Sequence, residues 1–284
     1  MKTKIPLAAI AAIYFLLISI TGWAQQPITL DDSLYSNILK EHRPIKVILP
    51  KTYNPGSTDK YDVLYVLDGE WNTSLAERLY AFLEHGKFIP KNMIIVSVPN
   101  RYDHGMNMRD RDFTPTPMQD RPGSGGASNF LLFLKKELVP YVNNKYPTNI
   151  EGNILYGTSL GGLFAVYAYL HEPALFRGYL TVEPSLWWDH GHLQKIAPKK
   201  LEGITGIKNT LWIGSRDGKD YREMGVADFD SLLVEKAPAG LTWKAQGYPN
   251  ETHFSAIWKG IYDGMRFIYA KDKAAGRFEV AKEK

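Results

Sequence analysis

Apolar and polar positions follow two different spacings along the chain from residue 43 onward. Short apolar runs typical of buried strands alternate with longer segments that have helical spacing. The strand-like segments are Arg43–Leu49, Tyr61–Leu67, Asn92–Val98, Asn153–Tyr156, Tyr179–Val182, Thr210–Ile213 and Thr242–Gly247. The helix-like segments are Leu75–His85, Ser128–Tyr146, Leu163–Leu170, Ala227–Glu235 and Trp258–Tyr269. This alternation predicts an α/β protein with a mostly parallel central sheet and helices on both faces.

The segment Arg101–Ala127 is polar, rich in Gly and Pro, and has no periodicity. It therefore predicts a long surface loop. Loops of this length are uncommon inside a compact domain and are often functional.

The N-terminus has the pattern of a secretion signal. Lys2 and Lys4 precede an apolar run over Ile5–Ile20, and small residues at Gly22 and Ala24 follow. The run is short for a membrane-spanning helix, although an uncleaved anchor is the alternative. We therefore expect a signal over residues 1–24 with cleavage after Ala24, and one domain over residues 25–284. This protein would be periplasmic or secreted, without stable membrane insertion after cleavage.

The composition narrows the possible chemistry. The 284 residues include no cysteine, which excludes thiol catalysis, disulfides and cysteinyl metal sites. The 34 Lys and Arg residues outnumber the 30 Asp and Glu residues by only four, which is too few to indicate a nucleic-acid partner. We expect no metal and no cofactor, and the oligomeric state stays open.

The sequence Gly157-x-Ser159-x-Gly161 matches the nucleophile elbow, a sharp turn from a strand to a helix. An apolar strand precedes the motif and an apolar helix follows it, which is the context that the motif requires. Glycine on either side of the serine leaves room for the neighbouring strand and helix. We therefore expect Ser159 to be a catalytic nucleophile.

A serine nucleophile needs a base, and in this type of fold the order along the chain is serine, acid, histidine. Of the seven histidines, His253 alone follows a late strand, so it is the expected base. The acid should follow the preceding strand, where Asp217 stands. Asp220 and Glu223 lie on the same loop, and a dyad without an acid also stays open.

Two backbone amides are expected to form an oxyanion hole. One is the N–H of Leu160, directly after the nucleophile, at the start of a helix. The other lies near Gly69 or Glu70, in the loop that follows the strand ending at Leu67. Asp68 is expected to be a structural aspartate of that turn.

Loops at the ends of strands are where ligands bind in open α/β sheets. The aromatic residues Trp71, Phe113, Trp187 and Trp188 come from such loops and would suit an aromatic acyl group or a sugar. The alternative is that the tryptophan pair packs a helix against the core. Arg101, Arg109 and Arg111 could meet an anionic substrate, or could pair with the aspartates interleaved with them: Asp103, Asp110 and Asp112.

Several motifs carry a family resemblance over nearly all of the chain beyond the signal. They are Val47–Pro50 with Tyr53, Val63–Glu70, Arg109–Pro115, Gly125–Ala127, Glu137–Tyr141, the elbow with Gly161 and Gly162, Pro184–Trp188 and His253–Ser255. With these motifs the chain resembles the esterase family of the α/β-hydrolase fold that includes enterochelin-type siderophore esterases, bacterial feruloyl esterases and esterase D. The resemblance implies an α/β-hydrolase fold without a large separate lid domain.

The resemblance also implies Ser159 as nucleophile, His253 as base and a contribution of the Asp68-Gly69 loop to the oxyanion hole. Relatives often carry a small residue where this chain has Glu183, which either adds charge near the pocket or pairs with an arginine. Some siderophore esterases of this group work with a Ser–His dyad, which leaves the role of Asp217 open.

The sequence therefore predicts a serine carboxylic ester hydrolase that forms an acyl-enzyme on a small-molecule ester. Candidate substrates are siderophore lactones, acylated sugars and simple short acyl esters. An acyltransferase with the same Ser–His centre is the first alternative. The second is a non-catalytic ligand-binding relative that keeps the fold.

Overall fold

The computed structural model describes residues 27–56 and 58–274. The expected secretion signal lies outside these residues. Within them, no helix is both long and apolar enough to cross a membrane.

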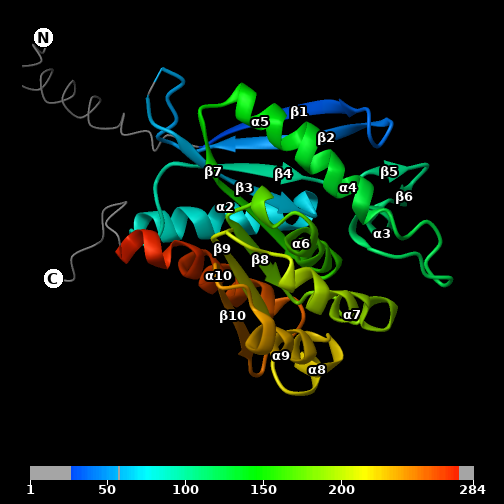
Figure 1. Ribbon diagram of the computed structural model, residues 1–284. Coiled ribbons are helices and arrows are strands. Elements are labelled where there is room, and N and C mark those ends of the chain that lie inside the picture. Colours follow the sequence, from blue (N-terminus) through cyan, green and yellow to red (C-terminus); the bar gives the residue numbers. More distant parts are fainter. Residues whose placement is uncertain (1–26, 57, 275–284) are drawn as a thin grey trace, which may run out of the picture.

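The described residues are built on one eight-stranded sheet (Figure 1). Its order is β1 (Ile28–Ser36), β2 (Glu41–Leu49), β4 (Met93–Val98), β3 (Tyr61–Leu67), β7 (Thr148–Thr158), β8 (Gly178–Val182), β9 (Asn209–Arg216) and β10 (Leu241–Tyr248). The pairs β1–β2 and β2–β4 are antiparallel, and all the other pairs are parallel. Strands β3, β4 and β8 are almost wholly buried, as their continuous apolar runs predict.

Helices cover both faces of the sheet. On one face lie α2 (Gly69–His85) and α10 (Ser255–Ala274), which share one apolar core with the strands. The other face carries α4 (Ala127–Phe133), a π-helical turn η1 (Leu134–Leu138), α5 (Val139–Lys145), α6 (Leu160–His171), α7 (Trp188–Glu202) and α9 (Val226–Lys236). The expected mostly parallel α/β fold is therefore confirmed.

Two features differ from the sequence expectations. Strand β1 was not expected, because its sequence is largely polar and most of its residues are exposed at the edge of the sheet. Helix α4 begins at Ala127, one residue before the expected start at Ser128, with Gly126 as its N-cap.

The long segment Arg101–Ala127 is not a structureless loop. It contains a small hairpin, β5 (Tyr102–Asp103) and β6 (Met106–Asn107), and the short helix α3 (Arg109–Phe113). The remaining short helices are η2 (Pro173–Leu175) and α8 (Lys219–Glu223).

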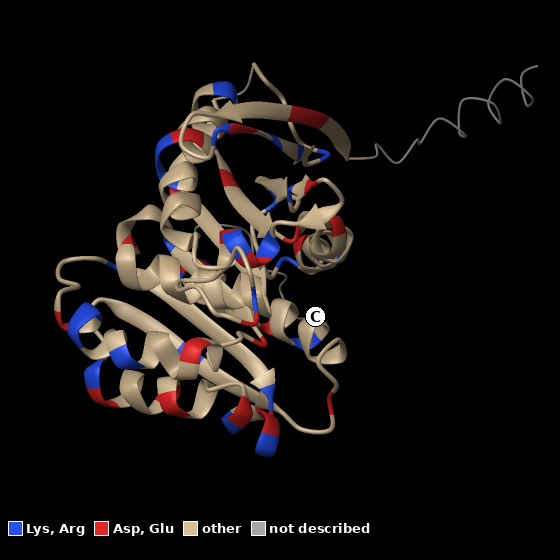
Figure 2. Cartoon of the chain, turned by 90° about the vertical axis from the view of Figure 1, so that its right-hand side faces the viewer, with Lys and Arg blue, Asp and Glu red and all other residues tan. Residues whose placement is uncertain are grey.

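The parallel strands bring distant parts of the sequence to one edge of the sheet. Asp68 follows β3, Ser159 follows β7, Glu183 follows β8 and Asp217 follows β9. Figure 2 views the side on which these strands end, and acidic and basic residues are interleaved over it. Ligands bind at this edge in open α/β sheets, so these residues stand where a ligand site is expected.

Candidate active site

Ser159 stands at the turn between β7 and α6 in a strained backbone conformation. Its φ of 55° and ψ of −119° lie in a region that non-glycine residues rarely adopt. The surrounding contacts hold this geometry, because Ser159 N–H donates to the carbonyl of Val182 and its own carbonyl accepts from Ser185 N–H. Ser159 is half-buried, and its Oγ lies 3.4 Å from Ser185 Oγ. The turn therefore has the geometry that the elbow motif predicts.

The glycines of the motif are required by close packing. A Cβ at Gly157 would collide with the carbonyl oxygen of Gly161. A Cβ at Gly162 would lie 2.8 Å from Thr181 Oγ1 and 3.0 Å from Pro184 Cα. The helix α6 can thus start against β7 and β8 only because these positions have no side chain.

The expected oxyanion amides both lie in the first turn of a helix. Leu160 is the first residue of α6, and Gly69 and Glu70 are the first two residues of α2. The first N–H groups of a helix have no intrahelical partner and carry the positive end of the helix dipole. These amides are therefore suited to binding a developing negative charge.

A hydrogen-bonded cluster joins the two helix starts. Arg109 donates from Nε to Asp68 Oδ1 at 2.6 Å and from Nη2 to Asp68 Oδ2 at 2.9 Å. The same Nη2 donates to the carbonyl of Thr158, the residue before the nucleophile, at 3.2 Å. The side-chain amide of Asn72 joins the same two segments, because its Nδ2 donates to the carbonyl of Leu67 and to Oγ1 of Thr158. Arg109 therefore holds the turn at Asp68 against the end of β7.

Asp68 is the buried carboxylate in this cluster. Its backbone is left-handed, with a φ of 51°, at the start of α2. Burial raises the pKa of Asp68, and the ion pair with Arg109 together with a hydrogen bond from Asn100 Nδ2 opposes that rise. The expected structural role of Asp68 is consistent with these contacts. Glu70 contributes its carboxylate as well, accepting hydrogen bonds from Asn100 N–H and Nδ2.

His253 is half-buried in the loop that follows β10. Its Nδ1 lies 2.8 Å from Oε2 of Glu183. Because Nδ1 is hydrogen-bonded, the other ring nitrogen, Nε2, is the one available to accept a proton from a nucleophile. Glu183 directly follows Val182, the residue that accepts the hydrogen bond from Ser159 N–H. Glu183 thus contacts His253 and directly follows the residue that holds the backbone of Ser159.

Glu183 is fully buried and is surrounded by donors. Its carboxylate accepts hydrogen bonds from His253 Nδ1, Ser215 Oγ, Arg216 N–H and Arg216 Nε. Burial alone would raise the pKa of Glu183, but these donors outweigh burial and hold its pKa below the ordinary value. Glu183 also has a left-handed φ of 52°, which is uncommon for a non-glycine residue.

Asp217, the acid expected from the sequence, is directed elsewhere. Its carboxylate accepts from Gly218 N–H at 2.6 Å, and its backbone N–H donates to the carbonyl of Tyr248. The other two candidates are occupied as well, Asp220 with Arg216 and Glu223 with Lys219. The structure therefore places Glu183, and none of these three residues, against His253.

The two tryptophans of the Pro184–Trp188 motif have different environments. Trp188 is 1% exposed and donates from Nε1 to the carbonyl of Thr116, so it belongs to the core and not to a substrate surface. Trp187 is 39% exposed. After them, Asp189, His190 and Gly191 all adopt left-handed backbone angles, so the chain makes a sharp turn before α7 continues.

Exposed aromatic residues stand close in sequence to several of the candidate site residues. Trp71, 58% exposed, lies two residues after Gly69, and Trp187 lies two residues after Ser185. Phe254, 79% exposed, directly follows His253 and contacts its ring edge-on at 5.7 Å. Sequence reasoning missed Phe254, although its position next to the expected base could have indicated it. Phe113, by contrast, is buried.

Arg111 forms ion pairs that hold the α3 segment in place. It donates to both carboxylate oxygens of Glu41 and to Oδ1 of Asp112, and Asp112 in turn pairs with the buried Arg43. These contacts fasten α3 to β2. The expectation that Arg111 binds substrate is therefore replaced by its alternative, pairing with a neighbouring aspartate.

Within residues 27–56 and 58–274, no group of three or more His, Asp or Glu side chains is placed to hold a metal ion.

The sheet order, the strained serine at the turn after β7 and the helices on both faces define an α/β-hydrolase fold. The chain belongs to the esterase family: residues 36–231 match the family model described as "Putative esterase".

Relatives with known names are siderophore esterases. The chain is 28% identical over 170 residues to ferri-bacillibactin esterase BesA of Bacillus subtilis, covering 55% of this chain and 58% of that protein. It is 34% identical over 193 residues to a siderophore enterobactin esterase of Emericella nidulans, covering 58% and 62%. The chain thus spans about 60% of the length of these curated relatives.

A solved structure supports the same family. An IroE-like serine hydrolase from Shewanella oneidensis superposes with a TM-score of 0.75 at 33% identity, covering 84% of this chain and 79% of that chain.

Proposed function

We propose that this protein is a serine carboxylic ester hydrolase that acts through an acyl-enzyme on Ser159, with His253 as base and Glu183 as acid. One observation carries the proposal: the strained Ser159 is hydrogen-bonded through its backbone to the strand end that presents Glu183, and Glu183 orients His253. Membership of the esterase family supports the same chemistry.

In the first step, Ser159 Oγ attacks the ester carbonyl carbon and His253 Nε2 takes the hydroxyl proton. The carbonyl oxygen becomes an oxyanion, which the N–H of Leu160 and an N–H at Gly69 or Glu70 stabilise. The tetrahedral intermediate then collapses, and His253 returns its proton to the departing alcohol. Water, activated by the same histidine, attacks the acyl-enzyme and releases the carboxylic acid.

Glu183 acts through the histidine in this scheme. A hydrogen bond from Nδ1–H to the carboxylate selects the tautomer in which Nε2 accepts a proton, and the negative charge stabilises the imidazolium that forms. Its four donors keep the carboxylate ionised at neutral pH even though it is buried. This assignment replaces Asp217 as the acid.

For the substrate, we propose an ester outside the cytoplasm, such as a siderophore lactone or an acylated sugar. The named relatives are esterases of siderophores, and the exposed rings of Trp71, Trp187 and Phe254 offer flat apolar surfaces to a bulky acyl group. A hollow of about 440 Å³ beside Trp187 would give room for part of a large substrate. It is lined among others by His190, Gln194, Lys195, Arg222 and Glu223.

The location follows from the N-terminal pattern. We propose export to the periplasm or the medium with cleavage after Ala24. Mass spectrometry of the mature protein, secreted from a host with the full leader, should give a chain that begins at Gln25. A chain that still begins at Met1 in the membrane fraction would support the anchor instead.

A fluorophosphonate probe tests the proposal, because it reacts covalently with an activated serine. The wild-type protein should be labelled, and Ser159→Ala should abolish both the labelling and ester hydrolysis. Ser185→Ala is the matched control for a neighbouring hydroxyl and should remain labelled. Absence of labelling in the folded wild type would support the non-catalytic alternative.

Product analysis separates hydrolysis from acyl transfer. A panel should hold one siderophore lactone, one feruloylated or acetylated sugar and one short acyl ester, each with and without an added alcohol acceptor. Free acid as the main product supports the hydrolase. A transferred ester that outcompetes hydrolysis at millimolar acceptor would assign an acyltransferase with the same centre.

A further inference from the structure

The carboxylate that orients His253 is itself held by an arginine. Arg216, the last residue of β9, contacts Glu183 twice, through its backbone N–H and through Nε at 2.8 Å from Oε2. The same oxygen, Oε2, accepts from His253 Nδ1. Arg216 and His253 therefore share one carboxylate oxygen. A change in the charge of one of them changes the electrostatic potential at the other.

Arg216 is in turn held from the opposite side. Its Nη1 lies 2.9 Å from Oδ1 of Asp220, at the start of α8. Four titratable side chains thus follow one another in a row, each in contact with the next: His253, Glu183, Arg216 and Asp220. They come from the loop before α10, the end of β8, the end of β9 and the helix α8, so that the row connects four separate elements.

We propose that Arg216 is a positioning residue for the proposed reaction: it keeps Glu183 ionised and oriented, and so sets the pH above which His253 can act as a base. This inference rests on the proposed function, because it assigns Glu183 to the acid role.

Glu183 is fully buried. An ionised carboxylate without solvent contact is strongly destabilised unless donors surround it. Of the four hydrogen bonds to Glu183, only those from Arg216 Nε and, when protonated, His253 bring a positive charge. Ser215 Oγ and the backbone N–H of Arg216 are neutral donors. During the part of the cycle in which His253 is neutral, Arg216 is thus the cation that compensates Glu183.

Removing the guanidinium of Arg216 raises the proton affinity of the His253–Glu183 pair in two ways. The pKa of Glu183 rises, because burial is no longer opposed by the ion pair. An ionised Glu183 that has lost Arg216 also attracts the proton on His253 more strongly. Both effects increase the proton affinity of the His253–Glu183 pair, so both move the acid limb of the activity profile to higher pH.

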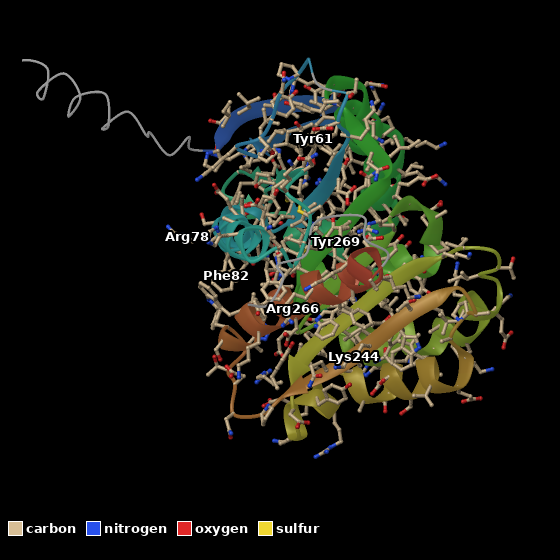
Figure 3. The ribbon with its side chains drawn as sticks, turned by 90° about the vertical axis from the view of Figure 1, so that its left-hand side faces the viewer. Tyr61, Arg78, Phe82, Lys244, Arg266 and Tyr269 are labelled. Carbon is tan, nitrogen blue, oxygen red and sulfur yellow. The ribbon has the colours of Figure 1, made fainter. Side chains whose placement is uncertain are left out.

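The test compares pH profiles of kcat/KM on an activated ester for the wild type, Arg216→Gln and Arg216→Lys. Arg78→Gln serves as control, because Arg78 is exposed on α2, on the side shown in Figure 3, away from the site. We expect the midpoint of the acid limb to move up by about one pH unit in Arg216→Gln, with Arg216→Lys in between. Arg78→Gln should superpose on the wild type. A drop of the same factor at every pH, with an unchanged midpoint, would overturn the proposal.

A second measurement does not depend on substrate. NMR of protein with isotope-labelled histidines follows the ring signal of His253 as the pH is changed. The signal is assigned by its loss in His253→Asn. The titration is run in Ser159→Ala and in the double variant Ser159→Ala/Arg216→Gln. We expect the midpoint to rise in the double variant. An unchanged midpoint refutes the role of Arg216 whatever the protein hydrolyses. A raised midpoint in a protein without ester hydrolysis would preserve the coupling and refute the proposed reaction instead.

Discussion

At the scale of single residues, the central finding is a glutamate in contact with His253 that comes from the strand next to the nucleophile. Glu183 follows β8, whereas the expected Asp217 follows β9. Both residues directly follow a buried strand at the same edge of the sheet. Their position at a strand end therefore does not distinguish them. The longer side chain of Glu183 reaches Nδ1 of His253, while Asp217 turns to the amide of Gly218.

Exchanging each carboxylate for its amide distinguishes the two. Glu183→Gln should lose about a hundredfold or more in kcat, because the amide leaves the imidazolium without a charge partner and does not fix its tautomer. Asp217→Asn, its matched control, should remain within about twofold, since Asp217 contacts a backbone amide and not the histidine. Steady-state kinetics on one activated ester measures both. The reverse order of effects would restore Asp217 as the acid.

Glu183 also links stability to pH. Its pKa in the folded protein lies below the ordinary 4.5, so the unfolded state binds the proton more readily. The stabilisation from the ionised carboxylate is therefore fully present above about pH 4.5 and is lost as the pH falls through the lower folded value. The difference in unfolding free energy between wild type and Glu183→Gln should shrink on acidification from pH 7 to pH 3, as measured by urea denaturation. A difference that grows towards acid pH would contradict this direction.

The sequence indicated one candidate each for the nucleophile and the base, but several candidates for the acid. The candidate nucleophile Ser159 lies in a local motif whose glycines are required by close packing around one turn. Such a motif can be recognised from the sequence alone. Which carboxylate contacts His253 depends on the directions of the side chains that follow β8 and β9. Those directions are set by tertiary contacts and not by the local sequence. The signal that was available was a charged residue directly after the buried strand Tyr179–Val182, at Glu183.

At the scale of elements, Arg109 joins three segments that are far apart in the sequence. It projects from α3 between the start of α2 at Asp68 and the end of β7 at Thr158. Its guanidinium also stacks over the rings of Trp71 and Phe113, at 5.6 and 5.8 Å. The segment Arg101–Ala127 thus braces the start of α2, where the expected oxyanion amides of Gly69 and Glu70 lie.

The sequence left Arg109 between an anionic substrate and an interleaved aspartate, because its partner Asp68 cannot be identified from spacing. Asp68 lies 41 residues earlier, whereas the interleaved aspartates are immediate neighbours. The same holds for β1, whose polar sequence forms a strand only because β2 pairs with it along its whole length. Tertiary partners decide both cases.

Loss of Arg109 should therefore act on the transition state. Arg109→Lys keeps the charge but not the two-point contact with Asp68, and we expect kcat to fall about tenfold to a hundredfold with a small change in KM. Arg121→Lys is the control from the same segment, because Arg121 is exposed and its side chain pairs with Asp110 at 3.3 Å. An Arg109→Lys variant with raised KM and unchanged kcat would indicate direct substrate binding.

At the scale of the whole molecule, the two ends of the parallel strands have different tasks. The candidate site residues gather where the strands end, while the opposite end holds a cluster around Arg177. Arg177 pairs with Asp272 at 2.7 Å and stacks on Tyr269 of α10 at 4.5 Å. Figure 3 views this other side, with Tyr269 labelled. Asp62 of β3 accepts a hydrogen bond from Tyr269 and thereby ties α10 to the start of the sheet.

Arg177 is placed to hold the beginnings of three strands together. Its N–H donates to the carbonyl of Asn153 in β7, and its carbonyl accepts from Thr210 in β9. Its side chain is 22% exposed and faces both Asp272 and Asp62, so removing the cation takes away a positive charge from two partly buried carboxylates. Arg177→Met should thus lower the free energy of unfolding by about 3 kcal/mol.

The same variant tests the separation between the two ends. Since the cluster lies at the far end of β7 and β8 from Ser159 and Glu183, the folded fraction of Arg177→Met should keep kcat and KM near the wild-type values at a temperature well below its unfolding transition. Thermal denaturation and kinetics on the same preparation provide the two readouts. If kcat fell while the unfolding temperature did not change, the strand beginnings would be coupled to the chemistry and the separation would be wrong. Loss of stability with intact kinetics instead assigns this end of the sheet to folding, and leaves the opposite end free to carry strained residues such as Ser159 and Glu183.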